Sequence, residues 1–200
     1  MKVRLILLPM LLVTFAIVCA GKRPDILWIV AVDLGHGDVG FTGCRDISTP
    51  AIDAIANSGV ICREAYSPHP FCGPSRAALM SGRYQQRFSF YGNPLPKSAS
   101  GYDPDFGLPE SEVCIAELLS QSGYRTAIIG KWHLGSEDKF HPLNQGFSDF
   151  FGFLDGHRNY YKTDLQWQSV ASDESKAWNT RPPADESRKD YLTDLLSDEA

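Results

Sequence analysis

The stretch ILWIVAV, residues 26–32, is an unbroken apolar run that is rich in branched side chains. Runs of this length and composition are typical of strands that are buried on both faces, as in parallel sheets. Asp33 ends the run, and a glycine-rich segment at 34–40 follows it. We therefore predict a strand of an α/β sheet that ends in a turn at Asp33.

Strand and helix patterns alternate over the rest of the chain. The expected elements are, in order, a helix at 50–58, a weaker strand at 60–66, a helix from Cys72 to about Gly82, a helix at 111–122, a strand at 124–130 and a helix pattern within 188–200. The last helix would place Leu192, Leu195 and Leu196 on one face. Strands that alternate with helices indicate a mainly parallel sheet with helices on both faces.

The first twenty residues have the pattern of a secretory signal peptide. A basic start, an apolar stretch at 5–18 and small residues at 18–20 occur together. The apolar stretch is shorter than the roughly 20 residues of a membrane-spanning helix. We therefore expect residues 1–20 to be removed and residues 21–200 to be exported, to the periplasm or the extracellular space, without a membrane span. A buried helix and a lipid attachment site at Cys19 are the alternatives.

Charge and cysteine content narrow the classes of partner and site. The net charge of −5 argues against a nucleic-acid partner. Four cysteines follow residue 20: Cys44, Cys62, Cys72 and Cys114. Their spacing fits neither a zinc site nor a dense disulfide framework. In an oxidising compartment any two of them could pair, and the sequence leaves the pairing open.

Polar side chains follow the predicted strands at the place where α/β sheets bind ligands, beyond the carboxyl ends of the strands. Asp33 ends the first strand, and Cys72 precedes a helix. Lys131 and His133 follow the strand at 124–130, and in an extended chain they would point to the same side. Each residue alone has an ordinary interpretation, as a turn former or part of a surface loop. Their shared position predicts a ligand site.

The segment FCGPSRAALMSGR, residues 71–83, begins a helix with a thiol. Pro74 suits a first helical turn, and the free N–H groups there attract an anion. Arg76 lies one turn after Cys72, and helical side chains lean toward the N-terminus, so its guanidinium can reach the same place. An arginine fork suits a tetrahedral oxyanion such as sulfate or phosphate. The alternative is a buried structural cysteine beside an N-terminal proline.

Four segments resemble the type I, formylglycine-dependent sulfatases. CGPSR followed by AALMSGR (72–83) and GKWHLG (130–135) look like the two signatures of that family, and segments 23–43 and 146–161 are similar to parts that accompany them. The resemblance covers nearly everything from residue 23 onward. It implies the alkaline-phosphatase-like, three-layer α/β/α fold. It also implies that residues 21–200 are the N-terminal portion of a sulfatase catalytic domain, incomplete at its C-terminal end.

The resemblance also implies a nucleophile. Cys72 would be oxidised to formylglycine by a formylglycine-generating or an anaerobic sulfatase-maturating enzyme, and the aldehyde would be hydrated at rest. One hydroxyl would attack sulfur and expel the alcohol, and the other would then expel sulfate and regenerate the aldehyde. Arg76 and Lys131 would hold the modified residue and neutralise sulfate charge, while His133 would help to deprotonate it. His157 would contact sulfate or the leaving group.

A divalent cation is implied as well, Ca²⁺ in the first place with Mg²⁺ as the alternative. Asp33 and the formylglycine oxygens of residue 72 would be ligands, and the metal would polarise a sulfate oxygen. The family has two adjacent aspartates where this chain has Val32 and Asp33. Valine supplies no oxygen to a hard cation that needs six or more, so this departure puts metal binding in doubt. We expect Val32 instead to pack as the last core residue of its strand.

The expected function is hydrolysis of an aryl sulfate or a sulfated carbohydrate. Two alternatives stay open: a related hydrolase of phosphate or phosphonate esters, and a truncated or decayed relative without catalysis. The second alternative is favoured by Val32 and by the early end of the chain. Other acidic metal ligands and a second lysine of the family would lie beyond residue 200, so we expect these 200 residues to be inactive alone.

Overall fold

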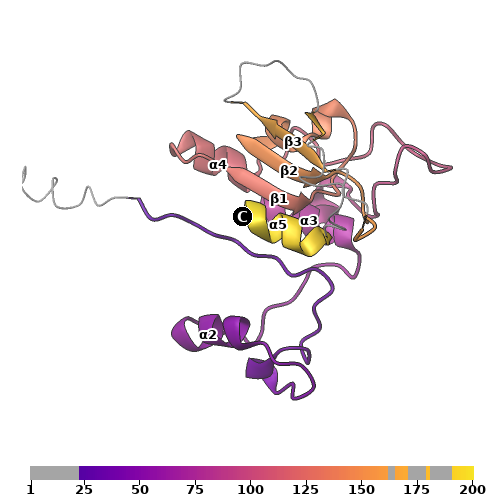
Figure 1. Cartoon of the computed structure of the whole chain (residues 1–200). Helices are drawn as coiled ribbons and strands as arrows, with labels where there is room; N and C mark the ends of the chain where they lie inside the picture. Colours follow the sequence, from indigo (N-terminus) through magenta and orange to yellow (C-terminus); the bar gives the residue numbers. More distant parts are fainter. Residues whose placement is uncertain (1–22, 162–164, 171–178, 181–190) are drawn as a thin grey trace, which may run out of the picture. The chain divides into compact units, whose positions relative to one another are not determined.

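A four-stranded sheet organises the second part of the chain (Figure 1). Its strands are adjacent in the order in which they occur in the sequence: β1 (Ala127–Lys131), β2 (Asp149–Phe153), β3 (Gln166–Ser169) and β4 (Asn179–Thr180). β1 and β2 are parallel, with Ala127 opposite Asp149 and Lys131 opposite Phe153. β3 and β4 each run antiparallel to the preceding strand.

The prediction of a mainly parallel sheet is therefore wrong for the strands that the structure describes. A parallel pair needs a long crossover, and the chain between β1 and β2 supplies one with two 3-10 helices, η3 (Asp138–Phe140) and η4 (Pro142–Gln145). The described residues between β2 and β3 contain no helix, and the chain returns so that β3 pairs antiparallel with β2.

The computed structural model describes residues 23–161, 165–170, 179–180 and 191–200. They belong to two compact units, 1–61 and 62–200. The predicted signal peptide lies outside the described residues, as does the start of the predicted C-terminal helix pattern. Within the described ranges, no helix is both long enough and apolar enough to cross a membrane.

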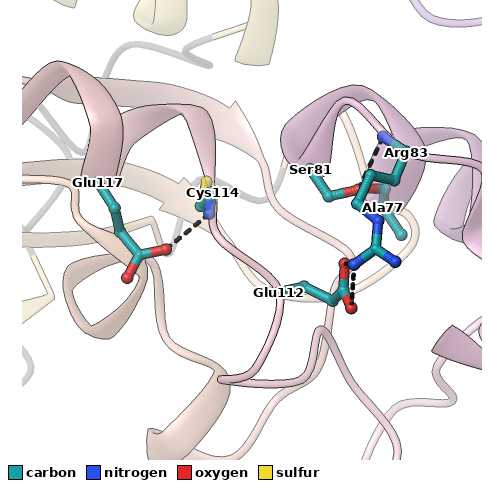
Figure 2. Close-up of polar contacts among 6 residues, drawn as sticks. All are labelled: Ala77, Ser81, Arg83, Glu112, Cys114 and Glu117. Carbon is teal, nitrogen blue, oxygen red and sulfur yellow. Dashed lines mark hydrogen bonds and ion pairs between the residues drawn. The ribbon is translucent and has the colours of Figure 1, made fainter.

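The helices agree largely with the sequence patterns. They are α2 (Pro50–Ser58), α3 (Cys72–Ser81), α4 (Ile115–Gln121) and α5 (Leu192–Glu199), with the shorter 3-10 helices η1 (Gly40–Thr42) and η2 (Gln85–Phe88). α2 and α3 match the prediction, and α3 ends at Gly82 with a φ of +64°. α4 begins at Ile115 rather than Ser111 because Cys114 is extended. The Glu117 carboxylate accepts a hydrogen bond from the Cys114 N–H at 2.6 Å, which fixes this helix start (Figure 2).

Successive residues of β2 belong to two different hydrophobic clusters. Phe150 belongs to a cluster that includes Ala77 of α3 and Ala116 of α4. Phe151 belongs to a second cluster, which includes Leu192 of α5 with Leu195 and Leu196 packed against it. The predicted apolar face of the last helix is thus confirmed. Since successive residues of a strand point to opposite faces, the two clusters draw on both faces of the sheet.

The apolar run at 26–32 forms no strand, which corrects the prediction that decided the fold class. Its large side chains are exposed, and the described sheet begins only at β1. An apolar run becomes a strand only where a neighbour accepts its backbone hydrogen bonds, and the described residues of the unit at 1–61 form no other strand. The weaker strand expected at 60–66 is absent as well. Val32 is 41% exposed and is not the core residue that we expected. Asp33 has a left-handed φ of 68°, which confirms the expected turn.

Candidate active site

Cys72 is the first residue of α3 and is partly exposed. The preceding Phe71 is extended, so the chain enters the helix at the cysteine. The Asn93 side-chain oxygen accepts a hydrogen bond from the Gly73 N–H at 2.8 Å and lies 3.6 Å from the Cys72 sulfur, whose thiol donates to it. One of the N–H groups that we expected to face an anion is therefore already bonded to a side chain.

Arg76, one helical turn after Cys72, is nearly buried, with 8% of its surface exposed. Its Nε donates to the carbonyl oxygen of Trp132 at 2.7 Å, and its Nη2 donates to the carbonyl oxygen of Lys131. Burial lowers the pKa of Arg76 to about 10, and the nearby Cys72 opposes this shift. The guanidinium stays charged at neutral pH. It has five N–H donors, so those not bonded to the two carbonyls can bind another acceptor.

The chain after β1 carries the second half of the site. The pairing with β2 continues past Lys131. The Trp132 N–H donates to the carbonyl oxygen of Phe153 at 2.9 Å, and the His133 N–H donates to the carbonyl oxygen of Leu154 at 3.0 Å. His133 has a left-handed φ of 56°, so the chain is not extended there as the prediction assumed. Lys131 is partly buried, and His133 is buried.

The imidazole of His133 is held in one tautomer. Its Nε2 lies 3.1 Å from the carbonyl oxygen of Pro94. A carbonyl can only accept, so Nε2 carries the proton and Nδ1 presents a lone pair. Nδ1 is buried and has no hydrogen-bond partner in the described structure. Such an orphaned acceptor is suited to a hydroxyl donor from a modified residue or a ligand.

Burial is the main cause that lowers the pKa of His133 to about 4, and the charges of Lys131, Arg76 and His157 act in the same direction. The hydrogen bond to Pro94 opposes the shift. His133 is therefore neutral at physiological pH, with three cationic or titratable side chains around it. His157 itself is exposed, in the loop after β2.

Gly156, next to His157, gives the His133 ring its space. A Cβ atom at Gly156 would lie 2.6 Å from both Cε1 and Nε2 of that ring, well inside contact distance. Arg76 contacts the main chain at Lys131, and the charges of Arg76, Lys131 and His157 act on His133 near the carboxyl end of β1. Cys72 is near enough to Arg76 to influence its pKa.

Sequence reasoning missed Asn93 and Pro94. They lie between η2 and α4, in a stretch for which the sequence predicts no helix or strand, yet one contacts Cys72 and the other contacts His133. The Asn-Pro dipeptide was the available signal, since the residue before a proline is restricted to an extended conformation and Asn-Pro favours turns.

The sequence predicts Asp33 and the oxygens of a modified residue 72 as metal ligands. In the described parts of the chain, no three histidine, cysteine, aspartate or glutamate side chains come together as metal ligands. Val32 has no oxygen to offer, so residues 32 and 33 supply a single carboxylate, which does not fit a hard cation that needs six or more oxygens.

An ion pair with one buried partner supports the end of α3. Arg83 contacts both carboxylate oxygens of Glu112 from Nη1, at 2.8 and 2.6 Å (Figure 2). The same turn contains a hydrogen bond from the Ser81 hydroxyl to the Ala77 carbonyl at 2.8 Å. Glu112 is buried, and it lies just before α4. The pair therefore connects the last residue of the motif at 71–83 to the start of the next helix.

Comparison with known proteins shows which family has these motifs. Residues 24–200 match the family model described as Sulfatase. N-acetylgalactosamine-6-sulfatase of Homo sapiens is 40% identical over 145 residues, which are 71% of this chain and 28% of that protein. Arylsulfatase A of Homo sapiens is 41% identical over 150 residues, 74% of this chain and 29% of that protein.

A solved structure is also similar. The structure of Ps i-CgsB in complex with k-i-k-neocarrahexaose superposes with a TM-score of 0.71 at 36% identity, over 89% of this chain and 40% of that one. The chain thus spans less than a third of the length of the two curated relatives and less than half of this solved chain. The family match nevertheless extends over almost every residue after 23 and includes both motifs of the site. The chain belongs to the sulfatase family.

Proposed function

We propose that this chain contributes the nucleophile-bearing part of an enzyme that hydrolyses sulfate esters. The observation that carries the proposal is the grouping of Cys72, Arg76 and His133 near the carboxyl end of β1. Arg76 bonds to the Trp132 and Lys131 carbonyls, its charge acts on His133, and Cys72 is close to Arg76. Two cations and a neutral histidine around a helix-initiating cysteine suit an anionic ester. Membership of the sulfatase family supports the choice of sulfate over phosphate.

In this proposal Cys72 becomes formylglycine, whose hydrated aldehyde supplies one hydroxyl for attack on sulfur and a second for release of sulfate. Arg76 uses the N–H groups that are free of the Trp132 and Lys131 carbonyls to bind anionic oxygens. Lys131 adds a second positive charge. His133 accepts a proton or a hydrogen bond at Nδ1, which has no other partner in the described structure. His157, exposed at the rim, contacts the sulfate or the departing alcohol.

The substrate class that we propose is a sulfated carbohydrate, with aryl sulfates as simple surrogates. The similarity to N-acetylgalactosamine-6-sulfatase and to a structure bound to neocarrahexaose supports this choice. The proposed partner in maturation is a formylglycine-generating or anaerobic sulfatase-maturating enzyme. We further propose export to the periplasm or the extracellular space, on the basis of the pattern at residues 1–20.

The proposed domain is the N-terminal portion, residues 21–200, of a three-layer catalytic domain. Support for three layers comes from the helices around β2: α3 and α4 share a hydrophobic cluster with Phe150, and α5 shares another with Phe151. Asp33 would supply one carboxylate to a Ca²⁺ or Mg²⁺ ion and would need further ligands that the described residues do not provide.

Mass spectrometry and a substrate panel test the proposal. The full-length protein is produced in a host that matures other sulfatases, and the peptide containing residue 72 should show loss of sulfur and gain of oxygen. A matched panel of sulfate and phosphate esters should show turnover of sulfates that Cys72→Ala abolishes and the exposed control Cys62→Ala retains. An unmodified thiol at residue 72, or turnover that survives Cys72→Ala, would remove the proposed nucleophile.

A further inference from the structure

The side-chain oxygen of Asn93 lies beside the side chain of residue 72 and can accept a hydrogen bond from it. Its Oδ1 accepts from the Gly73 N–H at 2.8 Å and faces the Cys72 sulfur at 3.6 Å. An amide oxygen has two lone pairs. One is used by the backbone, so the second is available to a donor on the side chain of residue 72.

The position of Asn93 is fixed from several directions. Pro94 restricts the backbone of Asn93 to extended conformations, and Pro94 is itself buried. The Pro94 carbonyl accepts from His133, so the next peptide group is held as well. Gly73 allows the close approach, because a Cβ atom there would lie 2.9 Å from Asn93 Oδ1 and 3.0 Å from Pro94 Cδ.

The two forms of a formylglycine at residue 72 differ in what they offer to this oxygen. The free aldehyde has no O–H group, whereas its hydrate has two. Hydration adds one water molecule across the C=O bond: the water oxygen bonds to carbon, and one of its protons moves to the former carbonyl oxygen. No oxidant or reductant is required. Only the hydrate can donate to Asn93 Oδ1 while that oxygen keeps its bond to Gly73.

We propose that Asn93 holds residue 72 in its hydrated form and fixes one of the two hydroxyls. This inference rests on the proposed function, because it needs formylglycine at residue 72. The Cys72 thiol, a weak donor at 3.6 Å, stands in the place of that hydroxyl. With one hydroxyl held by Asn93, the other is left for attack on the ester. Asn93 thereby sets both the hydration state and the orientation of the nucleophile.

Trapping of the free aldehyde in the folded protein tests the inference. The full-length protein is treated with methoxyamine, and oxime formation at residue 72 is followed by mass spectrometry. Asn93→Ala should react between about twofold and about tenfold faster than the parent, the range that loss of one neutral hydrogen bond gives for the hydration equilibrium. Asn93→Asp, which keeps the acceptor oxygen, should react at close to the parent rate. Asn144→Ala is the matched control, because Asn144 is exposed and contacts Asp138 instead.

Two further measurements separate the outcomes. In urea, where the contact is lost, all variants should react at one rate. If Asn93→Ala is unfolded by circular dichroism, Asn93→Leu, which is similar in volume and lacks the acceptor, takes its place. Complete conversion to formylglycine with equal trapping rates in the folded variants would overturn the role of Asn93 and leave the proposed function intact. A thiol at residue 72 in the parent protein would overturn the proposed function, and this inference with it.

Discussion

The Nε of Arg76 donates a hydrogen bond at 2.7 Å to the carbonyl oxygen of Trp132, so α3 is bonded to the chain just after β1. A second bond runs from Nη2 to Lys131. We expect Arg76→Ala to lower the free energy of unfolding by about 2–3 kcal/mol, because two carbonyls lose a charged donor, and also to abolish ester hydrolysis.

Urea denaturation and turnover of an aryl sulfate measure the two effects of Arg76→Ala separately. Arg76→Lys keeps the charge but has no Nε donor, and it should recover only part of the stability. An Arg76→Ala protein as stable as the parent would show that these bonds are of little consequence for folding.

The ion pair between Arg83 and Glu112 has unequal partners, with side-chain exposures of 46% and 7%. Removal of Arg83 leaves a nearly buried carboxylate without its cation. We therefore expect Arg83→Ala to destabilise the fold by about 1–3 kcal/mol, and Glu112→Gln in the same chain to restore part of the loss. Thermal denaturation of the single and double variants measures the coupling. Arg87→Ala is the exposed control and should change stability by less than about 0.5 kcal/mol.

Two buried histidines predict loss of stability in acid. Burial lowers the pKa of both His133 and His141 to about 4, from an ordinary value of 6.5. Below pH 6.5 the unfolded chain binds protons that the folded chain does not, so the free energy of unfolding falls as the pH drops from 6.5 to 4. Each histidine contributes a slope of up to about 1.4 kcal/mol per pH unit.

Denaturation at a series of pH values measures this slope. His141→Gln should reduce it, whereas His36→Gln, at an exposed position, should leave it unchanged. A slope that His141→Gln does not alter would mean that the pKa of His141 is the same in the folded and the unfolded chain.

Val32 stands where the resemblance to the type I sulfatases implies a second metal-binding aspartate. Val32 is 41% exposed, and Asp33 beside it has a φ of 68°, so the backbone already turns there. We expect Val32→Asp in the full-length protein to tighten Ca²⁺ binding by roughly tenfold, because it adds a charged oxygen ligand, and to do so without loss of stability.

Calorimetric titration with Ca²⁺ compares Val32→Asp with the parent and with Val30→Asp. Val30 is similarly exposed on the same segment and controls for added charge alone. Equal affinity in all three proteins would mean that residue 32 does not face the ion.

Helix α3 and the sheet differ in how far their sequences specify them. Local signals fix α3: a proline in its first turn, good helix formers and a terminal Gly82 require nothing from the rest of the molecule. Cys72, Arg76 and His133 were found because their motifs specify residue types at fixed spacing. Strand pairing is decided by contacts far along the chain, so neither the isolated run at 26–32 nor the antiparallel β3 could be assigned from periodicity.

Asn93 shows why part of the site was missed. Its role depends on where the loop after α3 passes, which no pattern in the sequence specifies. The positive φ of His133 was not predicted either, because only a small share of non-glycine residues adopt that conformation, even though histidine is enriched among them.

The continuation of strand pairing through Trp132 and His133 has a consequence for motion at the site. Both amides are bonded to the chain after β2, at 2.9 and 3.0 Å. The backbone of His133 is therefore hydrogen-bonded as if it were part of the sheet, although this residue lies beyond the last residue of β1. The amide hydrogens of these two residues should exchange with solvent as slowly as those inside β1. The acceptor at Nδ1 is then in place before any ester arrives, and little reorganisation of the imidazole is needed when charge develops beside it.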